Sequence, residues 1–219
     1  MKRCLIGLLM LTLALTGCVS DTHLPYRSWR LGFGAPVHME VWVEDAQVLD
    51  VAGKHFGGLG VGVTSAPSDE GNPSGWPHNP GPGAGQDING AALPKEIYVR
   101  WQSLVEPQAY QVVLHFTDAM RKQMLTQGPP PASSLKHPHP DWRYYNEVVV
   151  ILAPGGWVKV WLGGVVEKAI PIMCVKARVN PVGPYGGKSN GKYRPLTKKT
   201  ADYIATHPIP YDSWNCNAH

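Results

Sequence analysis

The chain has 219 residues, of which 43% are hydrophobic and 16% are charged, with a formal net charge of +4 at pH 7. It is long enough to fold as one domain with a substantial core. The weak positive charge argues against nucleic acid as a partner.

The first residues resemble a bacterial lipoprotein signal. Lys2 and Arg3 form a positive segment, residues 5–15 an apolar one, and Leu15-Thr16-Gly17-Cys18 a cleavage site. An ordinary secretory signal is the alternative, but a Cys directly after Leu-Thr-Gly favours lipidation. The apolar run is too short for a membrane span, which needs about 20 residues. We therefore expect Cys18 to be the lipidated first residue of the mature chain.

These features predict a signal peptide over 1–17, a tether over 18–28 and a single β-rich domain over 29–219. Val19-Ser20, rather than an Asp, follows Cys18. This predicts sorting to the outer membrane of a Gram-negative cell, with the lipid in the membrane and the domain facing the periplasm. Removal of the signal leaves 18 of the 20 basic residues against 16 acidic ones, which is close to neutral.

Two cysteines remain after the signal and the lipidated residue are set aside. Cys174 and Cys216 form an even pair in an oxidising compartment, which predicts a disulfide between them. The alternative is a buried Cys174 and a free Cys216 on the tail.

In chain order, hydrophobic alternation and short apolar runs predict strands at 37–44, 48–51, 97–101, 110–116, 148–152, 157–162 and 165–175. Asp45-Ala46 allows a turn, after which 48–51 can pair back. Thr117 or Asp118 can cap a short helix over 119–126, and a second short helix is expected over 197–206. Residues 65–92 and 180–195 are expected to be long Gly/Pro-rich loops, the first without structure of its own.

The stretch around Ala153-Pro154-Gly155-Gly156 is the centre of this pattern. An unbroken apolar run precedes it and a strict alternation follows it, so the two runs are predicted to form a β-hairpin. Short connections favour antiparallel pairing. The predicted fold is mainly β (α+β), a single antiparallel β-sandwich-like domain with two short helices.

Catalytic and metal motifs are weak. Residues 183–189 resemble a phosphate-binding loop, but the glycine spacing is wrong and no helix starts at Lys188. No serine lies in a Gly-x-Ser-x-Gly elbow. His137 and His139 lie in a proline-held segment without further ligands. We expect no catalytic residue, no metal site and no cofactor.

Glu40 and Glu44 are the one paired-carboxylate arrangement on a predicted strand. They share one strand face with Trp42, which lies between them, and paired carboxylates beside an aromatic residue could suit a glycosidase. A solvated polar strand face explains the same pattern, so a hydrolase is the less favoured interpretation.

Aromatic and basic residues supply the candidate binding positions. Trp157, Lys159 and Trp161 share one face of a predicted strand, where Lys159 can make cation–π contacts. Trp76 lies in the first long loop and Lys188 in the second. We assign these five residues to partner binding. Burial of the tryptophans in the core is the alternative.

Several landmarks together resemble a family of Gram-negative lipoproteins of unknown function. They are Trp29-Arg30 with the following Leu-Gly-Phe-Gly-Ala-Pro, Val41-Trp42-Val43-Glu44, 100–106 (Arg-Trp-Gln-Ser-Leu-Val-Glu) and Ala153-Pro154-Gly155-Gly156. Some similar lipoproteins resemble immunity proteins against type VI secretion phospholipase effectors. The resemblance implies a protein partner, a periplasmic lipase-like toxin, and carries no active site. A glycan- or envelope-binding module is the second hypothesis.

Overall fold

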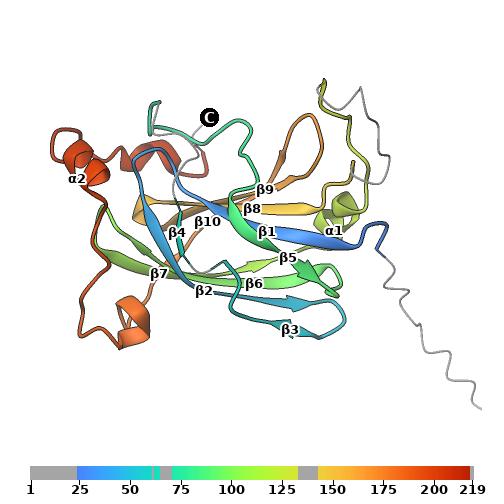
Figure 1. The fold of residues 1–219 in the computed structure, drawn as a ribbon, viewed down its shortest axis with the longest axis horizontal. Helices are drawn as coiled ribbons and strands as arrows, with labels where there is room; N and C mark the ends of the chain where they lie inside the picture. Colours follow the sequence, from blue (N-terminus) through green and yellow to red (C-terminus); the bar gives the residue numbers. More distant parts are fainter. Residues whose placement is uncertain (1–23, 61, 65–70, 133–142, 218–219) are drawn as a thin grey trace, which may run out of the picture.

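Two β-sheets, A and B, pack face to face, with one short helix at each end of the sandwich (Figure 1). The structure is a computed structural model that describes residues 24–60, 62–64, 71–132 and 143–217. No helix within these ranges is long and apolar enough to cross a membrane. The predicted fold class, a mainly β sandwich with two helices, is confirmed.

Sheet A has the strand order β10-β9-β8-β1-β5. Its pairs are antiparallel except for β1 with β8, which run parallel. The strands are β1 (Ser28–Gly34), β5 (Ala84–Asn89), β8 (Glu147–Ala153), β9 (Trp157–Gly163) and β10 (Ile170–Lys176). The predicted hairpin is therefore confirmed as β8 and β9. Its turn is the 3-10 helix η3 (Pro154–Gly156), in which Gly155 and Gly156 have φ of 72° and 75°.

Sheet B has the order β11-β7-β6-β2-β3, and β4 also pairs with β2. All its pairs are antiparallel. The strands are β2 (Val41–Asp50), β3 (His55–Phe56), β4 (Gly62–Thr64), β6 (Pro94–Ser103), β7 (Gln108–His115) and β11 (Arg178–Val179).

The core lies between the two sheets and is built from alternate residues of their strands. The largest core side chains of sheet A come from β1, and the largest core side chain of sheet B comes from β6. The fully buried set includes Trp29, Phe33, Val43, Trp101, Val148, Val150, Val158 and Val160, each 0% exposed. Burying side chains of this size supplies most of the stability of such a domain.

The predicted turn at Asp45-Ala46 is wrong, because β2 continues through it to Asp50. The pairing register with β6 shifts between Val43 and Asp45. This β-bulge adds one residue, so that Val43 and Ala46 both face the core and are 0% exposed. The bulge interrupts the hydrophobic alternation of the strand. The predicted turn rests on this interruption, although the chain does not reverse direction there.

The expectation that residues 65–92 lack structure is also wrong for their last part. Residues 84–89 form β5, the edge strand of sheet A, and Ile88 on it is 2% exposed. The two helices agree with prediction: α1 (Asp118–Met124) is capped by Thr117, and α2 (Lys198–Ile204) follows Thr197 as its cap.

Residues 184–195, which include the 3-10 helix η4 (Pro184–Gly187), cover part of the outer face of sheet B. The Glu44 carboxylate, only 2% exposed, accepts hydrogen bonds from Arg100 Nε at 2.7 Å and Gln102 Nε2 at 2.8 Å. It also accepts one from the Tyr185 backbone N–H. Glu44 thus fastens this segment to the sheet.

Glu40 has a similar role at the start of α2. Its carboxylate accepts hydrogen bonds from the Thr197 hydroxyl at 2.6 Å and the Thr197 N–H at 3.1 Å. The two carboxylates that sequence reasoning weighed as a hydrolase pair therefore each hold part of the C-terminal segment.

Glu44→Ala is expected to lower the free energy of unfolding by about 2 kcal/mol, because it leaves Arg100 and two further donors without their acceptor. Urea denaturation measures the difference. The control is Asp118→Ala, which removes the ion pair of an exposed carboxylate with Arg121 and should change stability by less than about 0.5 kcal/mol. Equal effects of the two variants would contradict the role of Glu44.

Candidate functional site

The outer face of sheet A carries four of the five predicted binding residues. Trp157, Lys159 and Trp161 alternate outward from β9. Trp161 is 2% exposed, whereas Trp157 and Lys159 are half-buried. Lys159 lies opposite Ile151 of β8 and Cys174 of β10. This row of side chains forms the floor of the site.

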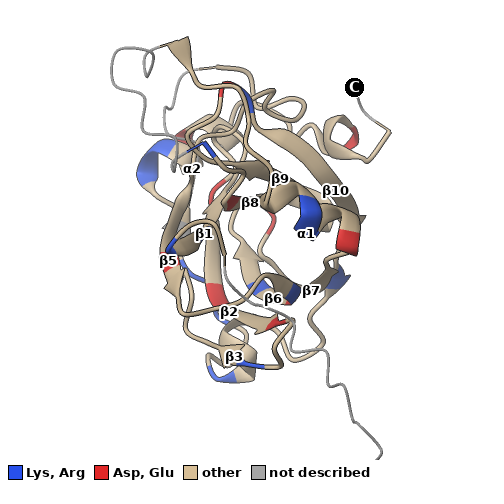
Figure 2. Ribbon diagram, turned by 90° about the vertical axis from the view of Figure 1, so that its right-hand side faces the viewer, with Lys and Arg blue, Asp and Glu red and all other residues tan. Residues whose placement is uncertain are grey.

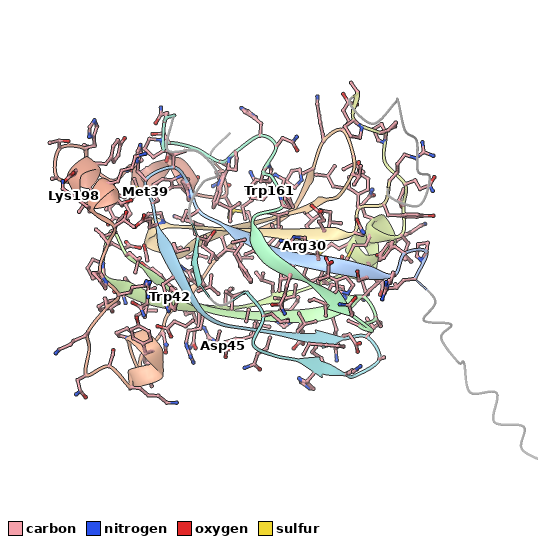
Figure 3. The ribbon with its side chains drawn as sticks, in the orientation of Figure 1. Arg30, Met39, Trp42, Asp45, Trp161 and Lys198 are labelled. Atoms are coloured by element: carbon pink, nitrogen blue, oxygen red, sulfur yellow. A yellow bond between two sulfur atoms is a disulfide. The ribbon has the colours of Figure 1, made fainter. Side chains whose placement is uncertain are left out.

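The loop of residues 71–83 lies over this floor, in which Trp161 is labelled in Figure 3, and Trp76 of the loop packs against it. The indole of Trp76 meets that of Trp161 edge-on, with ring centroids 6.0 Å apart. Lys159 Nζ is 5.7 Å from the centre of the Trp76 ring and 5.5 Å from that of Trp161. The ammonium group therefore sits against two aromatic rings, an arrangement that cation–π attraction stabilises.

Two outward-facing glycines of β1 make room on this face, Gly32 for the loop and Gly34 for the Ile151 side chain of β8. A Cβ atom on Gly32 would be 1.8 Å from the Pro82 carbonyl oxygen. A Cβ atom on Gly34 would be 2.6 Å from Ile151 Cδ1. Because both positions face outward while Phe33 between them faces the core, the Gly-Phe-Gly sequence leaves room for the loop at Gly32 and for Ile151 at Gly34 without weakening the interior.

A pocket of about 250 Å³ opens between this loop and the end of β1. Ile151 of β8 lines it on the sheet side, and most of its other lining residues are prolines and glycines, with Trp76 as the aromatic residue and Asn72, Ser74 and Asn79 as the polar ones. The apolar part of the lining includes Gly34, Pro36, Val37, Pro73, Trp76 and Pro77. A pocket of this size and lining fits one apolar side chain of a partner.

The C-terminal tail holds the loop in place. Trp214 is 0% exposed, and its indole N–H lies 3.1 Å from the Pro73 carbonyl and 3.2 Å from that of Gly75. Two residues later, Cys216 forms a disulfide with Cys174 of β10, which confirms the predicted pair. The tail is thus tied to both the loop and sheet A.

Glu106, in the turn between β6 and β7, fixes the last 3-10 helix, η5 (Tyr211–Trp214). Its carboxylate accepts the Gly155 N–H at 2.8 Å and hydrogen bonds from the phenols of Tyr110 and Tyr211. Burial, together with the Glu106 carboxylate, raises the pKa of both tyrosines above the usual range. Both phenols therefore stay protonated well into alkaline solution.

The fifth predicted residue, Lys188, lies elsewhere. It ends η4 over the outer face of sheet B, and its backbone N–H donates to the Tyr185 carbonyl. The structure therefore separates Lys188 from the other four by the thickness of the sandwich.

Sequence reasoning missed two contributors. Lys176 Nζ is 4.4 Å from the centre of the Trp157 ring, because the two residues pair across β10 and β9. Trp214 was overlooked, although its position two residues before a predicted disulfide cysteine was an available signal. Both extend the aromatic and basic character of the site.

Metal ligation has little support in the part of the chain that the structure describes. No group of three His, Cys, Asp or Glu residues there could hold an ion. His137 and His139, the weak metal candidates, lie outside the described residues.

A family model described as "Protein of unknown function (DUF2931)" matches residues 16–212, so the chain belongs to this family. No curated protein and no solved structure matches the chain. The match includes every strand and both helices of the sandwich.

Replacing both cysteines of the disulfide with serine is expected to lower the free energy of unfolding by up to about 4 kcal/mol, from the 42-residue separation of the pair and the chain-entropy estimate. Limited proteolysis should then cut near the tail while the sandwich stays folded. Reduction of the wild-type protein should reproduce the effect. If the tail of the double variant remained protected from proteolysis, the other contacts of the tail would be sufficient to hold it in place.

Stability should fall as pH rises above about 10, where unfolded tyrosines ionise but Tyr110 and Tyr211 do not. The raised folded-state pKa stabilises the native protein below this pH, and that contribution is lost as pH climbs toward the folded value. Glu106→Gln removes one cause of both shifts. The variant should be less stable than wild type at pH 8 by about 1–2 kcal/mol.

The stability difference between Glu106→Gln and wild type should then narrow at alkaline pH, because a phenolate beside the neutral amide of the variant lacks the repulsion that Glu106 exerts. Chemical denaturation of both proteins at a series of pH values measures this difference in the free energy of unfolding. A difference that does not depend on pH would exclude this coupling.

Proposed function

We propose that the protein is a lipid-anchored, periplasm-facing binding module that neutralises an antibacterial phospholipase-like toxin by occupying its surface. Anchorage rests on the signal pattern that ends at Cys18. The toxin class rests on the resemblance to lipoproteins of the type VI secretion immunity kind. Binding rests on the outer face of sheet A.

One observation carries the binding proposal: an aromatic and basic surface is held in a fixed conformation beside an apolar pocket. Trp76, Trp157 and Lys159 are all half-buried, so each retains surface for a partner. Aromatic residues are enriched in the energetic centres of protein interfaces. Because the disulfide and Trp214 already order the loop, a partner would bind without the entropic cost of ordering it.

The chemistry of the surface defines the complementary partner. Lys159 and Lys176 place two positive charges beside the rings of Trp161 and Trp157. A protein that inserts an apolar side chain into the pocket and sets carboxylates against these lysines would match it in shape and charge.

The acidic residues favour binding over hydrolysis. Glu40, Glu44 and Glu106 each accept hydrogen bonds from backbone N–H groups of this chain. A carboxylate engaged in this way serves as a fixed acceptor, whereas a general acid or nucleophile needs an oxygen free to meet the substrate.

The test directs a phospholipase toxin of the type VI secretion kind to the periplasm of a sensitive strain that expresses the protein. Trp157→Ala and Lys159→Glu should each weaken binding about 30-fold or more, as loss of an interface hot spot does. Survival of the cells and affinity in solution are measured together, with thermal unfolding to confirm that each variant is folded.

Lys188→Glu is the matched control, because it makes the same charge reversal on the opposite layer of the sandwich. It should leave both binding and survival unchanged. Full protection by folded Trp157→Ala and Lys159→Glu would move the contact surface away from sheet A. Absence of binding by the wild-type protein would reject the toxin class.

A further inference from the structure

The end of the sandwich where the chain enters is built from segments far apart in sequence. The ring of Tyr26, near the first described residue, lies 5.5 Å from that of Tyr144. The Gly128 N–H donates to the Arg143 carbonyl at 2.7 Å, which places the segment after α1 beside the start of β8. The entry of the chain therefore lies next to the C-terminal end of α1.

Two turns between strands also lie at this end of the sandwich. The turn between β9 and β10 is held there by the Glu167 N–H, which donates to the Pro129 carbonyl at 2.8 Å. The turn between β2 and β3 is fixed by Asp50, which accepts the backbone N–H groups of Lys54 and Ala92. We name this region the entry end; it is on the right in Figure 1, and Figure 2 looks onto it.

Each of these segments exposes one aliphatic side chain at the entry end. The exposed fractions are 47% for Val51 after β2, 42% for Leu125 after α1 and 40% for Val165 between β9 and β10. A single exposed aliphatic residue is ordinary on a protein surface. Three at one end, one on each projecting segment, form a discontinuous apolar rim.

Basic residues accompany the rim. Arg27, Lys54, Lys122 and Lys168 are all exposed. The exposed acidic residues of the neighbouring described segments are Asp118 and Asp87, which are paired with Arg121 and Arg30, and Glu167. The entry end is therefore apolar and net positive, a combination that suits the interface of an anionic bilayer.

The short chain between Cys18 and the folded domain limits the distance between the entry end and a lipid on Cys18. Leu24, the first described residue, comes six residues after Cys18, so the connecting chain spans at most about 20 Å when fully extended. A folded chain of this size has a radius of gyration of about 16 Å. A lipid on Cys18 would therefore keep the entry end close to the bilayer.

We propose that the entry end docks on the surface of an anionic phospholipid bilayer, with Val51, Leu125 and Val165 at the headgroup level and the four basic residues against lipid phosphates. This inference rests on the lipid anchorage in the proposed function, but not on the toxin. It gives the tethered domain a defined orientation.

The test places the acylated full-length protein in nanodiscs that contain phosphatidylglycerol. Cysteine is introduced by Leu125→Cys or Val165→Cys and labelled with a small fluorophore, since the native Cys174 and Cys216 are joined. Spin-labelled lipids then quench a probe that touches the bilayer. Both labels should be quenched strongly.

Val182→Cys is the matched control, because Val182 is 59% exposed and follows β11, which pairs with the start of β7 at the opposite end. Its label should be quenched weakly. Replacing Lys122 by Gln should reduce the ratio of docked to undocked protein about five-fold, the value of one lysine near an anionic surface. Lys192→Gln, at the opposite end, should leave the ratio unchanged.

Mass spectrometry of the N-terminal peptide reports the anchor separately. Acylated protein in which labels at 125 and 165 are quenched no more than the label at 182 would overturn the docking proposal while the anchorage stands. Protein without acyl chains would overturn the anchorage and the docking proposal with it. Quenching confined to 125 and 165, and weakened by Lys122→Gln, would support both.

Discussion

The backbone N–H groups of an irregular chain segment need hydrogen-bond acceptors from elsewhere in the protein. For the C-terminal segment of this chain, side chains of sheet B and of its connections provide these acceptors. The C-terminal segment, residues 183–217, crosses the outer face of sheet B, rounds the end that carries α2, and finishes on the outer face of sheet A (Figure 1). Along this path it meets a series of acceptors: Glu44 at Tyr185, Gln102 at Arg194, Glu40 at Thr197 and Glu106 at Tyr211.

These acceptors couple the two layers of the sandwich. The segment that Glu44 fastens to sheet B is the same one that ends with Trp214 and Cys216 on sheet A. Burying a carboxylate is costly unless donors replace its water, and several N–H and O–H donors do so here. The position of the 71–83 loop, and with it that of Trp76, therefore depends on contacts made on the far side of the molecule.

The features that sequence analysis predicted correctly have local causes. The hairpin of β8 and β9 follows from two apolar patterns around Pro154-Gly155-Gly156, and Thr117 caps α1 through a contact within its own turn. The disulfide followed from the compartment and an even count of cysteines. In each case the decisive information lies within a few residues or in composition.

The features that it missed depend on distant partners. β5 has a polar sequence, and it is recognisable as a strand only because Ile88 reaches the core and β1 pairs with it. Glu40 and Glu44 alternate like a solvated strand face. They are buried because a segment more than 140 residues later covers them. The parallel pairing of β1 with β8 also joins residues too far apart for any local pattern to indicate it.

Contacts between residues distant in sequence also determine how the candidate binding surface is oriented relative to the point where the chain enters the domain. The chain enters at one end of the sandwich, whereas the aromatic and basic surface lies on its flank, over β8 and β9 (Figure 3). A domain held by that end would present the flank roughly perpendicular to the bilayer. The partner that we propose, a phospholipase-like toxin, would have to approach the bilayer plane, and a flank held at this height would meet it there. Since the surface is already ordered by the disulfide and Trp214, orientation and loop order would both be set before the encounter.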